Sequence, residues 1–160
     1  MIPIVKHCGA GDRPSPRKGL HSMVDTQESV ELAQEVQGLL NQPVLYNLAT
    51  VNPNGSIQLN PIWGELHDGK IRINTLAGRR KHKNLVERGD QVTIMVSDPE
   101  DQLRYVEIRG RVEEMTDENG VEVIDRLAKK YTGADTYAHL QEGDVRVTIT
   151  IAPTKVFTHG

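Results

Sequence analysis

The chain has 160 residues and a mass of 17.8 kDa, which is the size of one ordinary domain of roughly 100–200 residues. Hydrophobic residues make up 37% and charged residues 26%, a composition typical of a folded globular protein rather than a disordered chain. No apolar run approaches the roughly 18 residues needed to span a bilayer. The single cysteine, Cys8, excludes an internal disulfide framework and a cysteine-rich zinc site. We therefore expect a cytoplasmic protein without a membrane span.

The net charge of −3 is unevenly distributed. Residues 1–22 carry four basic side chains and one acidic one, so this segment has a charge of +3 and the remainder a charge of −6. The segment has no apolar period and no signal-peptide core, so we expect a disordered leader or tag at 1–22 and a single domain at 23–160. An acidic body with one Trp, four Tyr and one Phe argues against a nucleic-acid partner, which needs clustered cations and stacking platforms.

A first helix is predicted from Asp25 to the residue before Pro43. Asp25 and Glu28 have the spacing of a capping box, in which carboxylates accept the free N–H groups of the first turn. An apolar face follows at helical spacing: Leu32, Val36, Leu39 and Leu40.

Strand formers dominate the next segments, 44–51, 56–66 and 70–76. Asn54-Gly55 supplies the positive φ angles of a tight hairpin between the first two, and Asp68-Gly69 marks the turn before the third. Consecutive antiparallel strands with short turns form a meander rather than a parallel βαβ unit. We therefore expect a mainly antiparallel sheet.

The second half of the chain continues this pattern. A basic loop and short helix are predicted at 77–88, strands at 91–97 and 103–115 with a bulge at Gly110, and a helix from Asp117 that ends at Gly133. The last strand starts at Val145 and continues past Pro153 to Phe157. Six strands and three helices favour a six-stranded antiparallel barrel, because closure hides the strand edges. Its small interior would leave a ligand outside the barrel or between two copies.

The run Gly78-Arg79-Arg80-Lys81-His82-Lys83-Asn84-Leu85 directly follows a predicted strand and opens a helix. Four cations in five positions repel one another unless an anion offsets them. Glycine permits close backbone approach, and a helix start offers free N–H groups to a phosphate. The alternatives are a solvated basic helix face and an unused nucleic-acid patch, and charge alone leaves them open.

Uncharged amides form a second pattern on the predicted strands. Gln58, Asn60 and Asn74 share the even-numbered register of strands expected to be neighbours, and amides suit a heterocycle with donors and acceptors. Pro61 interrupts the ladder and indicates an edge or bulge. A sheet face turned to water explains the same pattern. The only tryptophan, Trp63, either stacks on a planar ligand or fills the core or a dimer interface.

Other catalytic signatures are missing from the sequence. No pair among the six histidines has metal-ligand spacing, and no nucleophile elbow, Walker A loop, GxGxxG or Cys–His constellation occurs. We therefore assign no metal site and no catalytic residue.

Taken together, these motifs resemble the pyridoxamine 5'-phosphate oxidase-like split-barrel family, in its F420-dependent branch. The resemblance covers roughly residues 28–157, and its most specific part is the Gly-Arg-x-Lys-x-x-Asn-Leu element after the third strand. The matching segments are Leu48–Val51, Asn52–Gly55, Gln58 with Pro61–Trp63, Asp68–Thr75, Gly78–Leu85, Tyr105 with Gly110, and the strand that opens at Arg146.

The resemblance implies a homodimer of FMN-binding split-barrel type with a flavin or deazaflavin in a groove between subunits. By matching positions, Arg79, Arg80 and Lys81 hold the cofactor phosphate. Tyr105 and Arg146 match positions that reach the site from the partner subunit. The remaining cofactor-binding positions are Gln58, Asn60, Pro61, Asn74, Thr75, Leu76 and Asn84.

For function, the resemblance implies hydride transfer between reduced F420 and a small unsaturated or oxidised organic substrate. The cofactor supplies the chemistry, in keeping with the missing nucleophile, and solvent or a polar group supplies the proton. His82 and Lys83 add charge that suits the polyglutamate tail of F420, which favours F420 over FMN. An FMN-dependent oxidase or reductase and a non-catalytic flavin, deazaflavin or haem carrier remain as alternatives.

Overall fold

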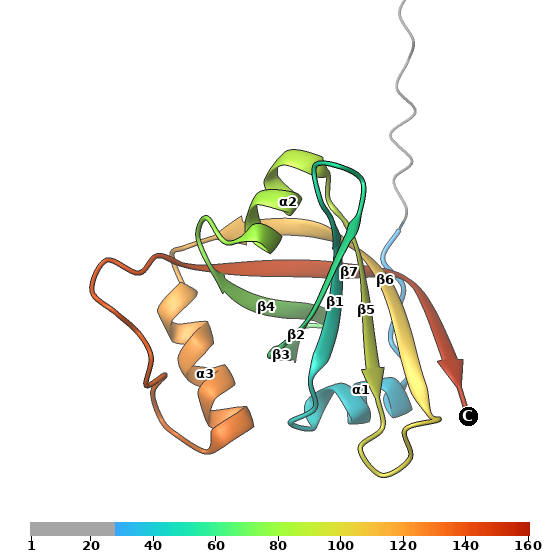
Figure 1. Cartoon of the computed structure of the whole chain (residues 1–160). Coiled ribbons are helices and arrows are strands. Elements are labelled where there is room, and N and C mark those ends of the chain that lie inside the picture. Colours follow the sequence, from blue (N-terminus) through green and yellow to red (C-terminus); the bar gives the residue numbers. More distant parts are fainter. Residues whose placement is uncertain (1–27) are drawn as a thin grey trace, which may run out of the picture.

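A single antiparallel sheet curls into a half-barrel in the computed structural model, which describes residues 28–160 (Figure 1). The strand order is β2-β1-β5-β6-β7-β4-β3. The strands are β1 Tyr46–Val51, β2 Ile57–Ile62, β3 Gly64–His67, β4 Lys70–Leu76, β5 Gln91–Ser97, β6 Tyr105–Thr116 and β7 Arg146–His159; the helices are α1 Gln34–Asn41, α2 Arg80–Arg88 and α3 Gly120–Thr132. The predicted mainly β fold is confirmed, whereas the expected leader at 1–22 lies outside the described residues.

The structure has seven strands where the sequence predicted six. The predicted strand 56–66 is divided at Trp63 into β2, which pairs with β1, and β3, which pairs with β4. The single predicted strand thus provides two strands, each with a different partner. The two predicted hairpins are therefore present as β1–β2 and β3–β4, but the three predicted strands do not form one continuous meander.

The first helix is shorter than predicted. Helix α1 starts at Gln34, and the backbone before it is extended. The amide of Val30 donates to the carbonyl oxygen of Pro153 at 2.8 Å, so this segment runs against β7. The proposed capping residue Asp25 lies outside the described residues, and Glu28 is not in the helix. Tertiary pairing with β7 has overridden the capping pattern.

Other local predictions hold. The register of β6 against β7 shifts between Arg109 and Gly110, which confirms the bulge. Gly133 ends α3 with a φ of 78°, in the left-handed region that glycine favours. The helix itself begins at Gly120 rather than Asp117. Strand β7 runs through Pro153 as expected.

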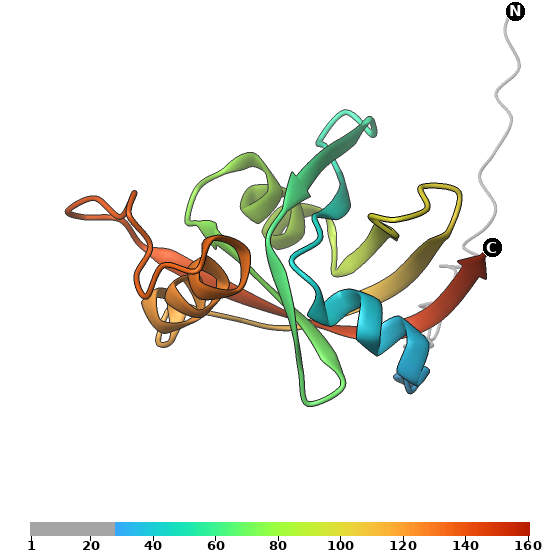
Figure 2. The same ribbon diagram turned by 90° about the horizontal axis from the view of Figure 1, so that it is seen from below.

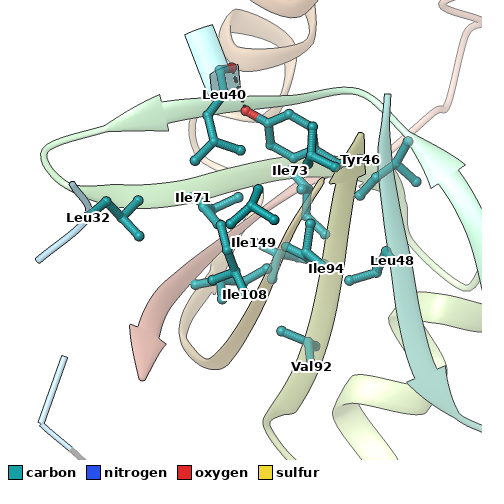
Figure 3. Close-up of a cluster of buried hydrophobic side chains, with 14 of the residues drawn as sticks. Leu32, Leu40, Tyr46, Leu48, Ile71, Ile73, Val92, Ile94, Ile108 and Ile149 are labelled. Atoms are coloured by element: carbon teal, nitrogen blue, oxygen red, sulfur yellow. Dashed lines mark hydrogen bonds between the residues drawn. The ribbon is translucent and has the colours of Figure 1, made fainter. Parts of the chain in front are cut away.

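The core lies inside the curled sheet (Figure 3). Its fully buried side chains come from five strands and include Leu48, Ile71, Ile73, Ile94, Ile108 and Ile149. Tyr46 is also fully buried, and its hydroxyl donates to the Leu40 carbonyl oxygen at 2.7 Å, which fixes the end of α1 to β1. Within residues 28–160, no helix is long and apolar enough to cross a membrane.

The helices lie at different sides of the half-barrel. Figure 1 shows α2 at one end, α1 at the opposite end and α3 beside β4, and Figure 2 shows the same separation of α3 from α1. A second apolar cluster of Val123, Ile124 and Leu127 attaches α3, with Trp63, Tyr131 and Tyr137 packed against it.

Candidate cofactor-binding site

The basic motif forms the turn between β4 and α2. Gly78 has a φ of +78°, and Arg79 is the residue that precedes the first helical turn. The first turn of α2 contains no acidic side chain, so the positive end of the helix is not neutralised locally. The Gly78 amide donates to His82 Nδ1 at 3.2 Å, which closes the turn. The predicted loop-to-helix geometry is therefore present.

Three cations converge beside this turn without a carboxylate partner. Burial lowers the pKa of Lys81, and the charges of Arg79 and Arg146 lower it further. Burial is also the largest cause that lowers the pKa of Arg146, and Arg79 lowers it further, whereas Tyr137 and Asp144 act in the opposite direction without forming an ion pair with Arg146. The nine ion pairs formed within residues 28–160 include none of these three side chains. We call Arg79, Lys81 and Arg146 the cation triad.

Arg146 is held in place by a buried amide. Its Nε donates to Asn74 Oδ1 at 2.7 Å, and Asn74 Nδ2 donates to the Gly120 carbonyl oxygen at 2.8 Å. A Cβ atom at Gly120 would lie 1.9 Å from the Arg146 carbonyl oxygen, so only glycine allows α3 to start this close to β7. The Arg146 guanidinium also lies 5.2 Å from the centroid of the Tyr137 ring. The chain therefore fixes this cation before any ligand binds.

A cavity of about 250 Å³ lies next to Arg146, and we call it the aromatic cavity. Its lining combines predicted site residues with apolar ones: Leu45, Pro61, Ile62, Trp63, Asn74, Ile124, Tyr137 and Arg146. Trp63 stacks on Tyr131 with ring centroids 5.2 Å apart and meets Tyr137 edge-on at 6.0 Å. The interpretation of Trp63 as a packing residue is confirmed, and the same ring lines the cavity.

A larger hollow of about 670 Å³ lies between the β1–β2 hairpin and α2. Gln58 and Arg80 both line it. The Oε1 atom of Gln58 is buried and accepts no hydrogen bond within the described residues. A buried acceptor without a donor is costly, so this atom is suited to a ligand N–H or O–H group.

The expectation that Gln58, Asn60 and Asn74 lie on neighbouring strands is only partly correct. Strands β2 and β4 do not pair and stand near opposite ends of the sheet order, so Gln58 and Asn60 are not next to Asn74 in a ladder. Curling of the sheet still brings Pro61 and Asn74 to one cavity. Asn60 instead donates to the adjacent Pro61 carbonyl oxygen at 3.3 Å. The prediction that these amides share a register on paired strands was therefore wrong, although β2 and β4 do contribute to one cavity.

Other predicted positions are spread along the fold. Thr75 is buried and Leu76 half-buried at the end of β4, next to the basic turn. Asn84 is buried and donates to Thr50 Oγ1 and Asn52 Oδ1, each at 3.0 Å, so it fastens α2 to β1. Tyr105 is the first residue of β6, and its ring stacks on His159 at the end of β7. It does not join the cation triad within one chain.

The sequence interpretation missed Tyr137 as a site residue. Tyr137 lies in the loop between α3 and β7, and its amide donates to Asp125 Oδ1 at 2.8 Å. No periodic pattern marks a single aromatic residue in a loop. Its position against Arg146 depends on long-range packing that the local sequence does not encode.

Comparison with protein families identifies the fold family. The model of the pyridoxamine 5'-phosphate oxidase family matches residues 32–160. The chain belongs to this family. Nearly the whole described part of this oxidase-family chain falls within the match, including the cation triad. No curated protein sequence matches at a significant level.

Solved structures with the same fold agree. A protein described as an F420 reductase is 28% identical, with a TM-score of 0.69 over 79% of this chain and 98% of its own. A conserved hypothetical protein from Mycobacterium tuberculosis is 24% identical, with a TM-score of 0.64 over 82% of this chain and 86% of its own. HupZ of Group A Streptococcus is 22% identical, with a TM-score of 0.59 over 79% and 93%. The last two support the oxidase-family fold alone.

Proposed function

We propose that this member of the pyridoxamine 5'-phosphate oxidase family is an F420-dependent oxidoreductase that acts on a small unsaturated or oxidised organic substrate. The observation that carries the proposal is the cation triad, because its three charges lie together and form no ion pair within residues 28–160. Such a cluster is unfavourable by itself and is stabilised when an anion binds. A phosphate on a planar redox cofactor is the anion that suits the family.

The residues present fit such a cofactor. Arg79 and Lys81 would bind the phosphate at the start of α2, where Arg forks and free N–H groups favour phosphate oxygens. Arg80 lines the hairpin hollow, and the unpartnered Gln58 Oε1 offers an acceptor there. The ring would extend along the ends of β2 and β4, past Asn60, Thr75 and Leu76, and would meet Pro61 and Asn74 from outside the cavity that these two residues line. Asn84 would act by holding α2.

F420 is proposed over FMN for two reasons. The structural relative described as an F420 reductase shares 28% identity and nearly its full length with this chain. In addition, Arg80 and Lys83 add positive charge to that of Arg79 and Lys81 in the first half of α2. The single phosphate of FMN would need fewer cations, whereas the carboxylates of the polyglutamate tail of F420 would pair with more of them. FMN remains the alternative, because the family binds flavin-type cofactors.

A homodimer is part of the proposal. Exposed apolar side chains share the outer face of the sheet, because cross-strand pairs project to the same side: Val51, Ile57, Leu59, Met95 and Phe157. Tyr105 is exposed on this face as well. A second copy packed here would bury the patch and would bring its Tyr105 toward a groove between subunits. Arg146, by contrast, would serve the site of its own chain.

The bound cofactor would supply two-electron hydride chemistry. The residues of the chain would bind its anionic group, hold its ring against the strand ends and exclude water with Trp63 and Tyr137. Solvent would provide the proton that completes reduction of the substrate. No protein nucleophile is required.

Parallel titration with F420 and FMN tests this function. We expect F420 to bind the purified protein more tightly than FMN, and reduced F420 to be reoxidised by at least one acceptor in a screen of enones, quinones and nitroaromatic compounds. Preferential FMN binding would identify an FMN enzyme. F420 binding without turnover of any acceptor would identify a carrier, and failure of both cofactors to bind would refute the proposal.

A further inference from the structure

We infer that the aromatic cavity beside Arg146 binds a small planar organic anion, a carboxylate on an aromatic or conjugated body, as the substrate of the proposed enzyme. The inference rests on the proposed function for the substrate role and on the cavity itself for binding. The cavity is formed where β2, β4, β7, α3 and the loop before β7 meet.

The polar wall of the cavity is a buried cation with free donors. The Arg146 residue is only 8% exposed, yet the one hydrogen bond that its side chain makes within residues 28–160 is from Nε to Asn74. Both Nη groups therefore form no hydrogen bond within residues 28–160, and Arg146 lines the cavity. A buried guanidinium without an ion-pair partner is unfavourable, and two parallel N–H donors match the two oxygens of a carboxylate.

Asn74 defines how the guanidinium is presented. Its Oδ1 accepts from Arg146 Nε and its Nδ2 donates to the Gly120 carbonyl oxygen, so the amide cannot rotate freely. The guanidinium carbon lies over the Tyr137 ring, 5.2 Å from its centroid. With Nε bonded to Asn74, the Nη groups are the donors left for a ligand.

The rest of the wall is apolar and aromatic. Trp63 and Tyr137 lie edge to face, and Leu45, Pro61 and Ile124 complete the lining. Flat rings favour a flat partner through offset or edge-on contacts. A carboxylate with a saturated, branched body would fill this space less well than an aromatic one.

The size of the cavity separates a substrate from the cofactor. Its volume of about 250 Å³ is below the roughly 300–1,000 Å³ of pockets that hold drug-sized ligands. The cavity would hold a small planar molecule whole, but only part of a flavin or deazaflavin. The cavity nevertheless adjoins the cation triad through Arg146, so a small molecule there would lie next to a cofactor held by Arg79 and Lys81.

Trp63 is the only tryptophan of the chain, and its emission therefore reports on this cavity directly. The test titrates the protein with benzoate, with benzamide as the uncharged probe of the same shape and with acetate as the charge without the ring. We expect benzoate to change Trp63 emission with an affinity about tenfold higher than that of benzamide, and acetate to bind more weakly than benzoate. Equal binding of benzoate and benzamide would overturn the inference.

Variants assign the effect to the guanidinium. Arg146→Gln should lower benzoate affinity about tenfold and leave benzamide affinity nearly unchanged, whereas Arg146→Lys should recover part of the loss because it keeps the charge. Arg88→Gln, an exposed cation at the end of α2, is the matched control and should behave like the wild type. Equal benzoate affinity in Arg146→Gln, with the melting temperature preserved, would refute the inference.

A final arm separates this inference from the proposed function. With F420 or FMN present at saturation, benzoate should still bind, because the two occupy adjoining sites. Competition between benzoate and the cofactor would show that the cavity belongs to the ring and would refute the substrate role. If neither cofactor binds while benzoate binds through Arg146, the proposed function fails and the anion site stands.

Discussion

The backbone of Gly64 lies directly against the ring of Tyr46: a Cβ atom added at Gly64 would meet the ring carbons Cδ2 and Cε2 at 2.3 Å. Tyr46 is fully buried, and its hydroxyl is already fixed to Leu40. The ring therefore has no free space into which to move. This contact lies where β2 gives way to β3, next to Trp63 and the aromatic cavity.

Substitution of Gly64 should destabilise the fold. We expect Gly64→Ala to lower the free energy of unfolding by about 1–3 kcal/mol, the usual cost of overpacking a core. Gly38→Ala in α1 is the matched control, because no atom lies within 4 Å of its added Cβ, and it should stabilise by roughly 0.5–1 kcal/mol. Urea denaturation of both variants measures the change in the free energy of unfolding. Equal changes would contradict the claim that Gly64 packs directly against the Tyr46 ring.

Lys130 contributes stability that depends on pH. Its Nζ donates to the carbonyl oxygens of Leu40 at 2.6 Å and Gly64 at 2.7 Å. Burial lowers its pKa to about 8, against a smaller opposite effect of Glu65. The unfolded chain therefore keeps a proton between about pH 8 and 10 that the folded chain has released, and stability rises with pH in this window.

Lys130→Met removes both the hydrogen bonds and the titration. We expect a loss of about 1–3 kcal/mol from the unpaired carbonyl groups, and this loss should be larger at about pH 9.5 than at about pH 7. Ionisation of unfolded tyrosines, whose pKa is about 10, affects both proteins alike and cancels in the comparison. Urea midpoints of both proteins at the two pH values provide the measurement. A stability difference between the two proteins that becomes smaller as pH rises would contradict the lowered pKa of Lys130.

Asn84 should act on the site through the position of α2. Asn84→Leu loses the bonds to Thr50 and Asn52 and should cost about 1–3 kcal/mol. Hydrogen exchange of the α2 amides should accelerate in this variant. Lys83→Gln, an exposed change on the same helix, serves as the control and should leave exchange unaltered. Unchanged exchange in Asn84→Leu would show that the side chain does not hold the helix.

The proposed dimer depends on the outer face of the sheet. Leu59 is 65% exposed on the edge strand β2, so an aspartate there leaves the fold of one chain intact. We expect Leu59→Asp to convert the dimer to a monomer in size-exclusion chromatography with light scattering. Leu103→Asp, in the turn before β6 and 78% exposed, should remain dimeric. A monomeric wild-type protein would refute the proposal.

Sequence patterns sufficed for elements whose geometry is local. The turn at Asn54-Gly55, where Gly55 alone has a positive φ, and the stop at Gly133 depend on the backbone preference of glycine, and both are present. The bulge at Gly110 is present as well, although there a Cβ atom would lie 2.5 Å from Ile151 Cγ2, so the close approach of β7 contributes. The basic motif was also readable, because its spacing defines the loop and helix start. Local chemistry thus predicted the geometry of the basic turn, and phosphate binding there stays a prediction.

Features set by tertiary contacts were not predictable in this way. The break at Trp63 arises because β2 and β3 pair with different strands, and α1 starts late because Val30 bonds to Pro153. Tyr137 reaches Arg146 from a loop with no periodic signal. The aromatic cavity therefore emerges only when the sheet has curled.

The most direct test of the central claim measures the affinity of F420 for the wild-type protein, Arg79→Gln, Lys81→Gln and the control Arg88→Gln under one buffer condition. We predict that each triad substitution weakens F420 binding by roughly 10- to 100-fold, the value of a charge-assisted hydrogen bond, while the control binds as the wild type does. Unchanged affinity in both triad variants, with folding intact, would contradict the claim that these cations bind the cofactor.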